Sequence, residues 1–276
     1  MNTTAGLISA HAELPELSWA FRSHPGVVRP ENEDCVGAYA PAEAVDHPRL
    51  FVVADGMGGH AAGEVASRLA VESLLREWTT ATPAPLNQAL RSAARAANGA
   101  VFAASLDQEH RGMGTTLTAL ALAGSEASIA HVGDSRAYHV RAGQCSQLTS
   151  DHSRIGEMLR MRLITPEQAA HHPARSQLTR SLGFTPAVQV DLVRTDIRPL
   201  DTFVLCSDGL WDLVSRNDIA EATAEKTPNE AAEVLLEQAL ERGAPDNVTL
   251  VVVRVLSELP MPAGVRARSR LAFLRR

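Results

Sequence analysis

The chain has 276 residues, 45% of them hydrophobic and 21% charged, which is ordinary for a globular protein with a sizeable core. Its 26 Lys and Arg against 32 Asp and Glu give a net charge of −6, and only 4% of residues are aromatic. The chain therefore has neither the net positive charge nor the aromatic side chains for base stacking that would favour nucleic-acid binding. The three cysteines are widely spaced and indicate neither a zinc-type pair nor a disulfide framework.

The first residues predict no targeting or membrane segment. Residues 1–16 lack a basic region followed by a continuous apolar stretch. No run in the chain approaches the roughly 20 apolar residues that a membrane span needs. We therefore expect a cytoplasmic protein with a flexible lead-in at residues 1–16, one domain at residues 17–256 and an Arg-rich tail at residues 257–276.

Short alternating or apolar runs predict the first strands, and longer periodic runs predict the first helices. An edge-like strand at residues 18–22 precedes a strand at 35–39 and a buried strand at 51–54. Two helices follow, one carrying its apolar face from Ala66 to Trp78 and one spanning residues 86–108. The Pro-rich linker between them predicts an adjacent helix pair.

The next strands form a meander of hairpins, which is typical of antiparallel sheets. They are expected at residues 115–123, 128–132, 137–140 and 144–148. Residues 151–182 then break the rhythm: they are rich in His and Arg, helical at residues 153–162 and again after Thr165-Pro166. We interpret this segment as an inserted flap.

The remaining elements repeat the order of strands followed by helices. Strands are expected at residues 188–197 and 203–206, helices near residues 217–224 and 229–242, and a last strand at residues 248–255. Because strands and helices come in blocks, the pattern predicts an α+β fold with antiparallel sheets covered by helix pairs.

Acidic residues recur where the expected strands end and turns begin. One such aspartate is usually a turn residue, but several from distant segments, without Cys or His pairs, indicate a site for a hard cation such as Mg²⁺ or Mn²⁺. Several carboxylates could not stay ionised together without cations between them. The candidates are Glu33, Asp34, Asp55, Asp134, Asp208 and Asp246.

Seven stretches, taken in order from about Ser18 to Val255, resemble the motifs of the PPM/PP2C metal-dependent protein serine/threonine phosphatases in their bacterial form. They are ENED with the preceding Arg29, VVADGMGGHAAGEVAS, GMGTTLTAL, HVGDSRAY, TRSLG, FVLCSDGLWD and GAPDNVTLVVV. Each motif alone is weak, but the ordered set is specific. The resemblance implies a central antiparallel β-sandwich flanked on both faces by helix pairs, a binuclear Mn²⁺ or Mg²⁺ centre at one end, and a flap subdomain.

The resemblance also implies which residues bind the metals. Asp55 would bridge two metal ions, and the carbonyl of Gly56 would bind one of them. Asp208 and Asp246 would complete the other, and Asp134 would contribute with Asp208 to a third metal site. A water between the two metals would then be activated to attack phosphorus, so that no protein nucleophile is needed.

Three further residues take supporting roles in this resemblance. Glu33 and Asp34 would hold metal-bound waters or a metal directly, with Glu33 in the outer shell. Arg29 would bind the substrate phosphate through its guanidinium fork, and a surface salt bridge to Glu31 or Glu33 is the alternative for Arg29.

The histidines leave more than one reading open. Met57 stands where eukaryotic relatives have a histidine that protonates the leaving group. His60 takes that role, lies in the outer shell or caps the following helix. His131 is expected in the core or the outer shell, whereas His152, His171 and His172 are expected to be solvated in the flap.

The implied activity is hydrolysis of phosphoserine and phosphothreonine in proteins, by a monomer that antagonises a bacterial Ser/Thr kinase. Two alternatives stay open: a non-catalytic phosphoprotein-binding member of the fold, and another metal-dependent phosphohydrolase. The tail is either a disordered end or a segment that docks on an acidic partner or an anionic membrane. Its arginines are Arg266, Arg268, Arg270, Arg275 and Arg276.

Overall fold

Two antiparallel sheets face each other in the computed structural model, which describes residues 6–41, 47–58, 62–80, 82, 84–170 and 172–261. The first sheet has the order β1 (Ile8–Glu13), β2 (Leu17–His24), β12 (Val248–Val255), β11 (Thr202–Cys206), β8 (Arg136–Arg141) and β9 (Gln144–Gln147). The second has the order β10 (Asp191–Asp196), β7 (Glu126–Val132), β6 (Leu117–Ala123), β4 (Arg49–Met57) and β3 (Asp34–Tyr39), and β5 (Gly114–Thr115) pairs with the end of β4.

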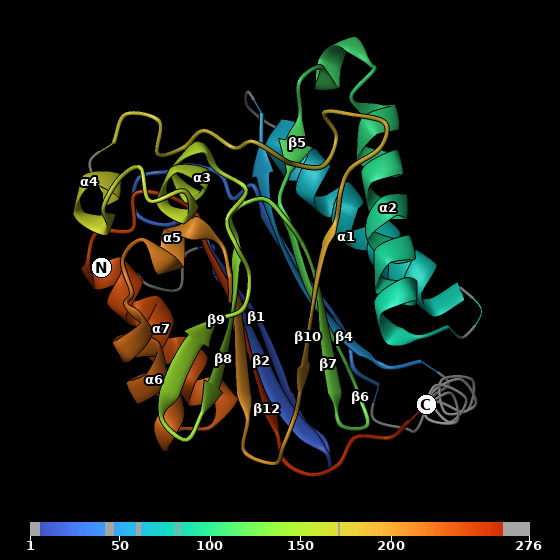
Figure 1. Ribbon diagram of the computed structural model, residues 1–276, viewed down its shortest axis with the longest axis vertical. Coiled ribbons are helices and arrows are strands. Elements are labelled where there is room, and N and C mark those ends of the chain that lie inside the picture. The colour runs from blue at the N-terminus through green and yellow to red at the C-terminus, as the bar shows by residue number, and fades with distance from the viewer. Residues whose placement is uncertain are drawn as a thin grey trace.

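One helix pair covers the outer face of each sheet, as Figure 1 shows. The pair α1 (Ala62–Thr80) and α2 (Leu86–Ala104) lies on the second sheet, and α6 (Arg216–Ala224) and α7 (Pro228–Glu241) lie on the first. Short elements complete the described chain: a 3-10 turn (Gln108–His110), α3 (Arg154–Arg160), α4 (Pro166–Ala170) and α5 (Asp208–Trp211). The predicted β-sandwich with flanking helix pairs is confirmed.

Alternation along the strands divides the core into three layers. In β4, Phe51 and Val53 pack between the sheets, while Leu50 and Val52 pack under α1 and α2. The last strand alternates in the same way, with Val251 facing the other sheet. Successive side chains of a strand point to opposite faces, so a strand covered on both sides is apolar throughout. This is why the central strands were visible in the sequence as continuous apolar runs.

The prediction of a flexible lead-in is wrong for residues 8–13, because they form β1. The strand pairs with β2 over its whole length, from Ile8 opposite Ser23 to Glu13 opposite Ser18. Its side chains are mostly exposed, so no apolar pattern announces it, and backbone hydrogen bonds hold it in place. Since β2 also pairs with β12, β2 is an internal strand and the expectation of an edge strand is wrong too.

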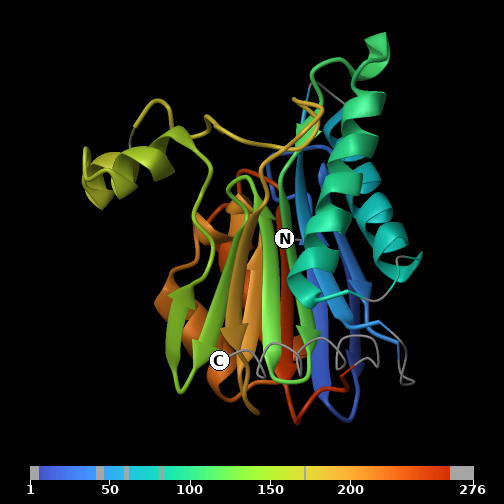
Figure 2. The same cartoon turned by 45° about the vertical axis from the view of Figure 1, so that its right-hand side comes forward.

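The flap projects beside one end of the sandwich, as the yellow-green segment in Figure 2 shows. Its two helices, α3 and α4, match the predicted helical stretches, and the Thr165 hydroxyl accepts the backbone N–H of Gln168 at 3.4 Å. Of the tail, residues 257–261 are described, and Leu259 is buried in the inter-sheet core. The tail arginines lie outside the described residues. None of the helices described is both long and apolar enough to cross a membrane.

Candidate metal centre

The predicted acidic residues meet at one end of the sandwich, although they come from both sheets. Asp34 opens β3 and lies directly opposite Asp55 near the end of β4. Asp208 begins α5, immediately after β11, and Asp246 precedes β12. The two sheets are linked here because the Ser207 hydroxyl donates to the Asp34 carboxylate at 2.7 Å. The fifth carboxylate, Asp134, follows β7, and its backbone carbonyl accepts a hydrogen bond from the indole N–H of Trp211 in α5 at 3.0 Å.

Burial and mutual repulsion make these carboxylates hard to ionise. Burial raises the pKa of Asp34 to about 7, of Asp134 to about 8 and of Asp208 to about 6. The pKa of Asp55 lies well above its ordinary value, first through burial and then through the charges of the other four aspartates. A site of this kind is stabilised by a cation that neutralises several carboxylates at once.

The donor set fits a hard divalent cation. Carboxylate and backbone carbonyl oxygens are the ligands that Mg²⁺ and Mn²⁺ prefer. Among the residues that the structure describes, no three His, Cys, Asp or Glu side chains stand in a ready arrangement around an ion. The Asp34 carboxylate accepts a hydrogen bond from the Ser207 hydroxyl. The Asp246 carboxylate accepts hydrogen bonds from the Arg29 guanidinium and from the backbone N–H of Asn247. These hydrogen bonds hold the Asp34 and Asp246 carboxylates in the metal-free protein.

Gly56 has no room for a side chain. A Cβ there would lie 2.1 Å from the carbonyl oxygen of Gly63 in α1 and 2.5 Å from that of Glu33. The backbone N–H of Gly56 donates to the same Glu33 carbonyl at 3.1 Å, and the Ser67 hydroxyl donates to it at 2.6 Å. Glycine at this position thus lets β4, the chain before β3 and the start of α1 approach one another beside Asp55.

Asn247 holds the loop that carries the first acidic pair, a role that the sequence analysis missed. Its side-chain oxygen accepts the backbone N–H of Glu33 at 2.8 Å, and its amide nitrogen donates to the carbonyls of Pro25 and Glu31 at 3.0 and 2.8 Å. The side chain is buried. The only sequence signal was its place after Asp246 at the head of the last strand.

Arg29 lies at the rim of this site. Its guanidinium donates to the Asp246 carboxylate at 2.9 Å, and about half of its side chain is exposed. The expected alternative, a salt bridge to Glu31 or Glu33, is therefore wrong in its partner. Because the guanidinium lies beside a candidate metal ligand and remains accessible to solvent, it is positioned to meet an anion that approaches the carboxylates.

The prediction that His152 is solvated is wrong, because the ring is buried at the base of the flap. One ring nitrogen accepts the backbone N–H of Gly133 at 3.1 Å, and the other lies 3.1 Å from Asp191. The ring also packs on His131, 4.7 Å between centroids, and His131 is in the core as expected. Partners from two distant segments, residues 131–133 and Asp191, surround His152, which a local sequence pattern does not reveal. His60 and His171 lie outside the described residues.

The metal-free protein is expected to lose stability as the pH rises through neutrality. Asp34 and Asp134 bind protons more tightly when folded than when unfolded, since their folded pKa values are raised. The free energy of unfolding should therefore fall by on the order of 2 kcal/mol between about pH 6.5 and 8.5. Burial lowers the pKa of His131 and His152, so these rings affect stability only at lower pH. Denaturant unfolding in EDTA measures the effect, and saturating Mn²⁺ should remove most of it. A metal-free stability that rises over this range would contradict the arrangement.

The family profile "Protein phosphatase 2C" matches residues 26–248. The "Serine/threonine protein phosphatase PstP" of Mycobacterium tuberculosis (strain ATCC 25618 / H37Rv) is 43% identical over 241 residues, which are 87% of this chain but 45% of PstP. The "Serine/threonine phosphatase stp" of Listeria monocytogenes is 40% identical over 239 residues, 84% of this chain and 94% of stp. The chain thus spans under half the length of PstP and nearly all of stp.

Solved structures of bacterial serine/threonine phosphatases have a fold similar to that of this chain. The catalytic domain of PstP, solved in complex with two manganese ions, matches with a TM-score of 0.77 and 40% identity, covering 88% of this chain and 99% of that one. The Stp1 structure from Staphylococcus aureus matches with a TM-score of 0.80 and 34% identity, covering 89% and 98%. Both sheets and both helix pairs therefore follow an architecture already seen in these proteins.

Proposed function

Because the chain belongs to the protein phosphatase 2C family, we propose that it is a metal-dependent phosphatase that hydrolyses phosphoserine and phosphothreonine in proteins. The observation that carries the proposal is the convergence of aspartates from both sheets at one end of the sandwich, with Arg29 at the rim. The names of the relatives support the substrate class, since they are serine/threonine phosphatases of bacteria. Opposition to a bacterial Ser/Thr kinase, in the cytoplasm, is part of the same proposal.

Two divalent cations, Mn²⁺ or Mg²⁺, would be held by the converging oxygens. Asp55 and the Gly56 carbonyl would serve one cation, and Asp55, Asp208 and Asp246 the other, while Asp134 is available to a third. When bound, such cations lower the pKa of a water molecule and neutralise charge that develops on a transferring phosphoryl group.

The other residues of the site would position ligands and substrate. Ser207 fixes the Asp34 carboxylate through its hydroxyl, and Asn247 holds the backbone on which Glu33 and Asp34 lie. Arg29 exchanges its contact with Asp246 for the substrate phosphate, since a guanidinium matches both oxyanions in a forked geometry. Arg29 orients the phosphoryl group and partly neutralises the charge of that group.

The test is turnover of a phosphothreonine peptide with and without Mn²⁺. We expect hydrolysis with Mn²⁺ or Mg²⁺ and its loss in excess EDTA, because carboxylates alone repel a phosphate dianion. Single-stranded DNA, assayed in parallel, should stay intact. Turnover that persists in EDTA, or DNA cleavage without peptide hydrolysis, would overturn the proposal.

A further inference from the structure

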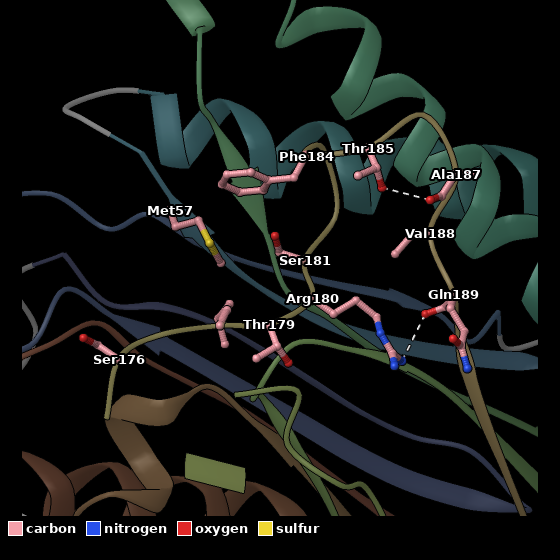
Figure 3. Close-up of a pocket in the computed structure, with 11 residues that line it drawn as sticks. Met57, Ser176, Thr179, Arg180, Ser181, Phe184, Thr185, Ala187, Val188 and Gln189 are labelled. Carbon is pink, nitrogen blue, oxygen red and sulfur yellow. Dashed lines mark hydrogen bonds between the residues drawn. The ribbon is translucent and has the colours of Figure 1, made fainter. Parts of the chain in front are cut away.

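A cavity of about 480 Å³ opens between the end of β4 and the segment that leaves the flap (Figure 3). Its size is in the range of small-molecule pockets, roughly 300–1,000 Å³. It is lined by Met57, Ser176, Leu178, Thr179, Arg180, Ser181, Phe184, Thr185, Ala187, Val188 and Gln189. None of these residues belongs to the candidate metal ligands, so the cavity is a separate feature of the same end of the molecule.

The cavity adjoins the metal centre along β4. Asp55 and Met57 are both partly exposed, whereas Gly56 between them is buried, so the two side chains open on the same side of the strand. Two residues along a strand span about 7 Å. The opposite wall is tied to this strand as well, because the Thr115 hydroxyl donates to the Asp55 carbonyl at 2.8 Å and the Thr115 backbone pairs with Leu182.

The lining is mostly apolar and hydroxylic, and its one charged residue is already paired with an acid. Arg180 carries the only charge among these residues, and its guanidinium turns to Asp191 at 2.6 Å and to the Gln189 carbonyl at 3.2 Å. The latter bond is drawn in Figure 3. An acidic group entering the cavity would lose water and compete with Asp191 for Arg180, whereas an apolar group would gain by leaving water.

Phe184 is the largest apolar side chain of the lining, and more than half of it is exposed. The ring lies on Gly114, where an added Cβ would be 2.5 Å from the ring atom Cε2. Gly114 pairs in turn with Met57. The Met57 and Phe184 side chains thus lie on the same side of the cavity, as Figure 3 shows.

We propose that this cavity binds an apolar side chain of the phosphoprotein substrate, one or two residues from the phosphorylated one. An extended peptide advances about 3.3 Å per residue, so a phosphate at Asp55 places a near neighbour in the sequence at Met57. The proposal rests on the proposed function and adds to it the local sequence that the enzyme selects.

The test uses phosphothreonine peptides in which the four neighbours, two on each side, are Ala in the parent and are replaced singly by Leu or Glu. At one position we expect kcat/KM to be about five- to tenfold higher for Leu than for Ala, and lower for Glu than for Ala. Phe184→Ala should reduce the Leu preference to less than about twofold. Turnover of the all-Ala parent peptide should change by less than about twofold in this variant.

Two further variants separate the cavity from general effects of the flap. Leu163→Ala removes an equally exposed apolar side chain between α3 and α4 and should keep the Leu preference. Ala187→Arg adds a cation to the lining and should favour Glu over Leu. Equal kcat/KM for all peptides, or a uniform loss in Phe184→Ala, would overturn the subsite and leave the phosphatase proposal standing. Failure to hydrolyse either the peptides or p-nitrophenyl phosphate with Mn²⁺ would overturn both.

Discussion

Asp55→Asn is expected to lower kcat for a phosphothreonine peptide by at least about a thousandfold at saturating Mn²⁺. The amide keeps the shape of the side chain but removes the charge with which the other four aspartates interact most unfavourably. The backbone around it should hold, because Thr116 accepts the Asp55 N–H and Thr115 donates to its carbonyl. Metal-free Asp55→Asn should therefore be more stable than the metal-free parent, while Mn²⁺ should stabilise it much less.

Single-turnover kinetics and thermal unfolding with and without Mn²⁺ measure these two effects. Asp196→Asn, at an exposed position of β10, is the matched control and should leave both unchanged. Wild-type turnover by Asp55→Asn would remove Asp55 from the metal centre. An unfolded variant would instead mean that the carboxylate supports the fold, contrary to its raised pKa.

Asn247→Ala is expected to lower the free energy of unfolding by about 2–4 kcal/mol. The substitution leaves the Glu33 N–H and the carbonyls of Pro25 and Glu31 without their buried partner, and each unsatisfied buried group is costly. Activity should also fall, because the backbone of Glu33 would no longer be fixed against the start of β12.

Urea unfolding of the Mn²⁺-bound and metal-free protein measures the change. Asn217→Ala, on the exposed face of α6, is the control and should alter stability by less than about 0.5 kcal/mol. If the two variants proved equally stable, the Asn247 contacts would contribute little to holding the site together.

The sequence predicted the parts of this fold that depend on local pattern. The run at residues 51–54 is apolar because both faces of β4 are buried, and the carboxylates Asp55 and Asp208 were recognised because each follows such a run. The strand β1 was not predicted, because it is stabilised by backbone pairing rather than by an apolar face. The spacing of apolar residues along a strand does not show which other strand it pairs with in the sheet.

The supporting residues of the site were harder to find for a related reason. Asn247 and His152 act through contacts with segments far away in the chain, so their surroundings exist only once the sandwich has formed. The sequence analysis gave Asn247 no role and placed His152 among the solvated residues of the flap. Charged residues at the ends of strands can be recognised from the sequence. Residues that position them through hydrogen bonds to distant segments cannot.

The pairing of β2 with β12 has a consequence for how the protein is made. Leu17 lies opposite Val255 and His24 opposite Val248, so the first sheet joins an early strand of the domain to the last strand that the structure describes. Such long-range pairing slows folding, since a large loop must close before the contact forms. On the ribosome, Asp246 and β12 emerge after the other strands of the sandwich. A nascent chain that ends before Asp246 therefore lacks both the strand that completes the sheet and a candidate ligand of the metal centre, and we expect it to have no hydrolytic activity.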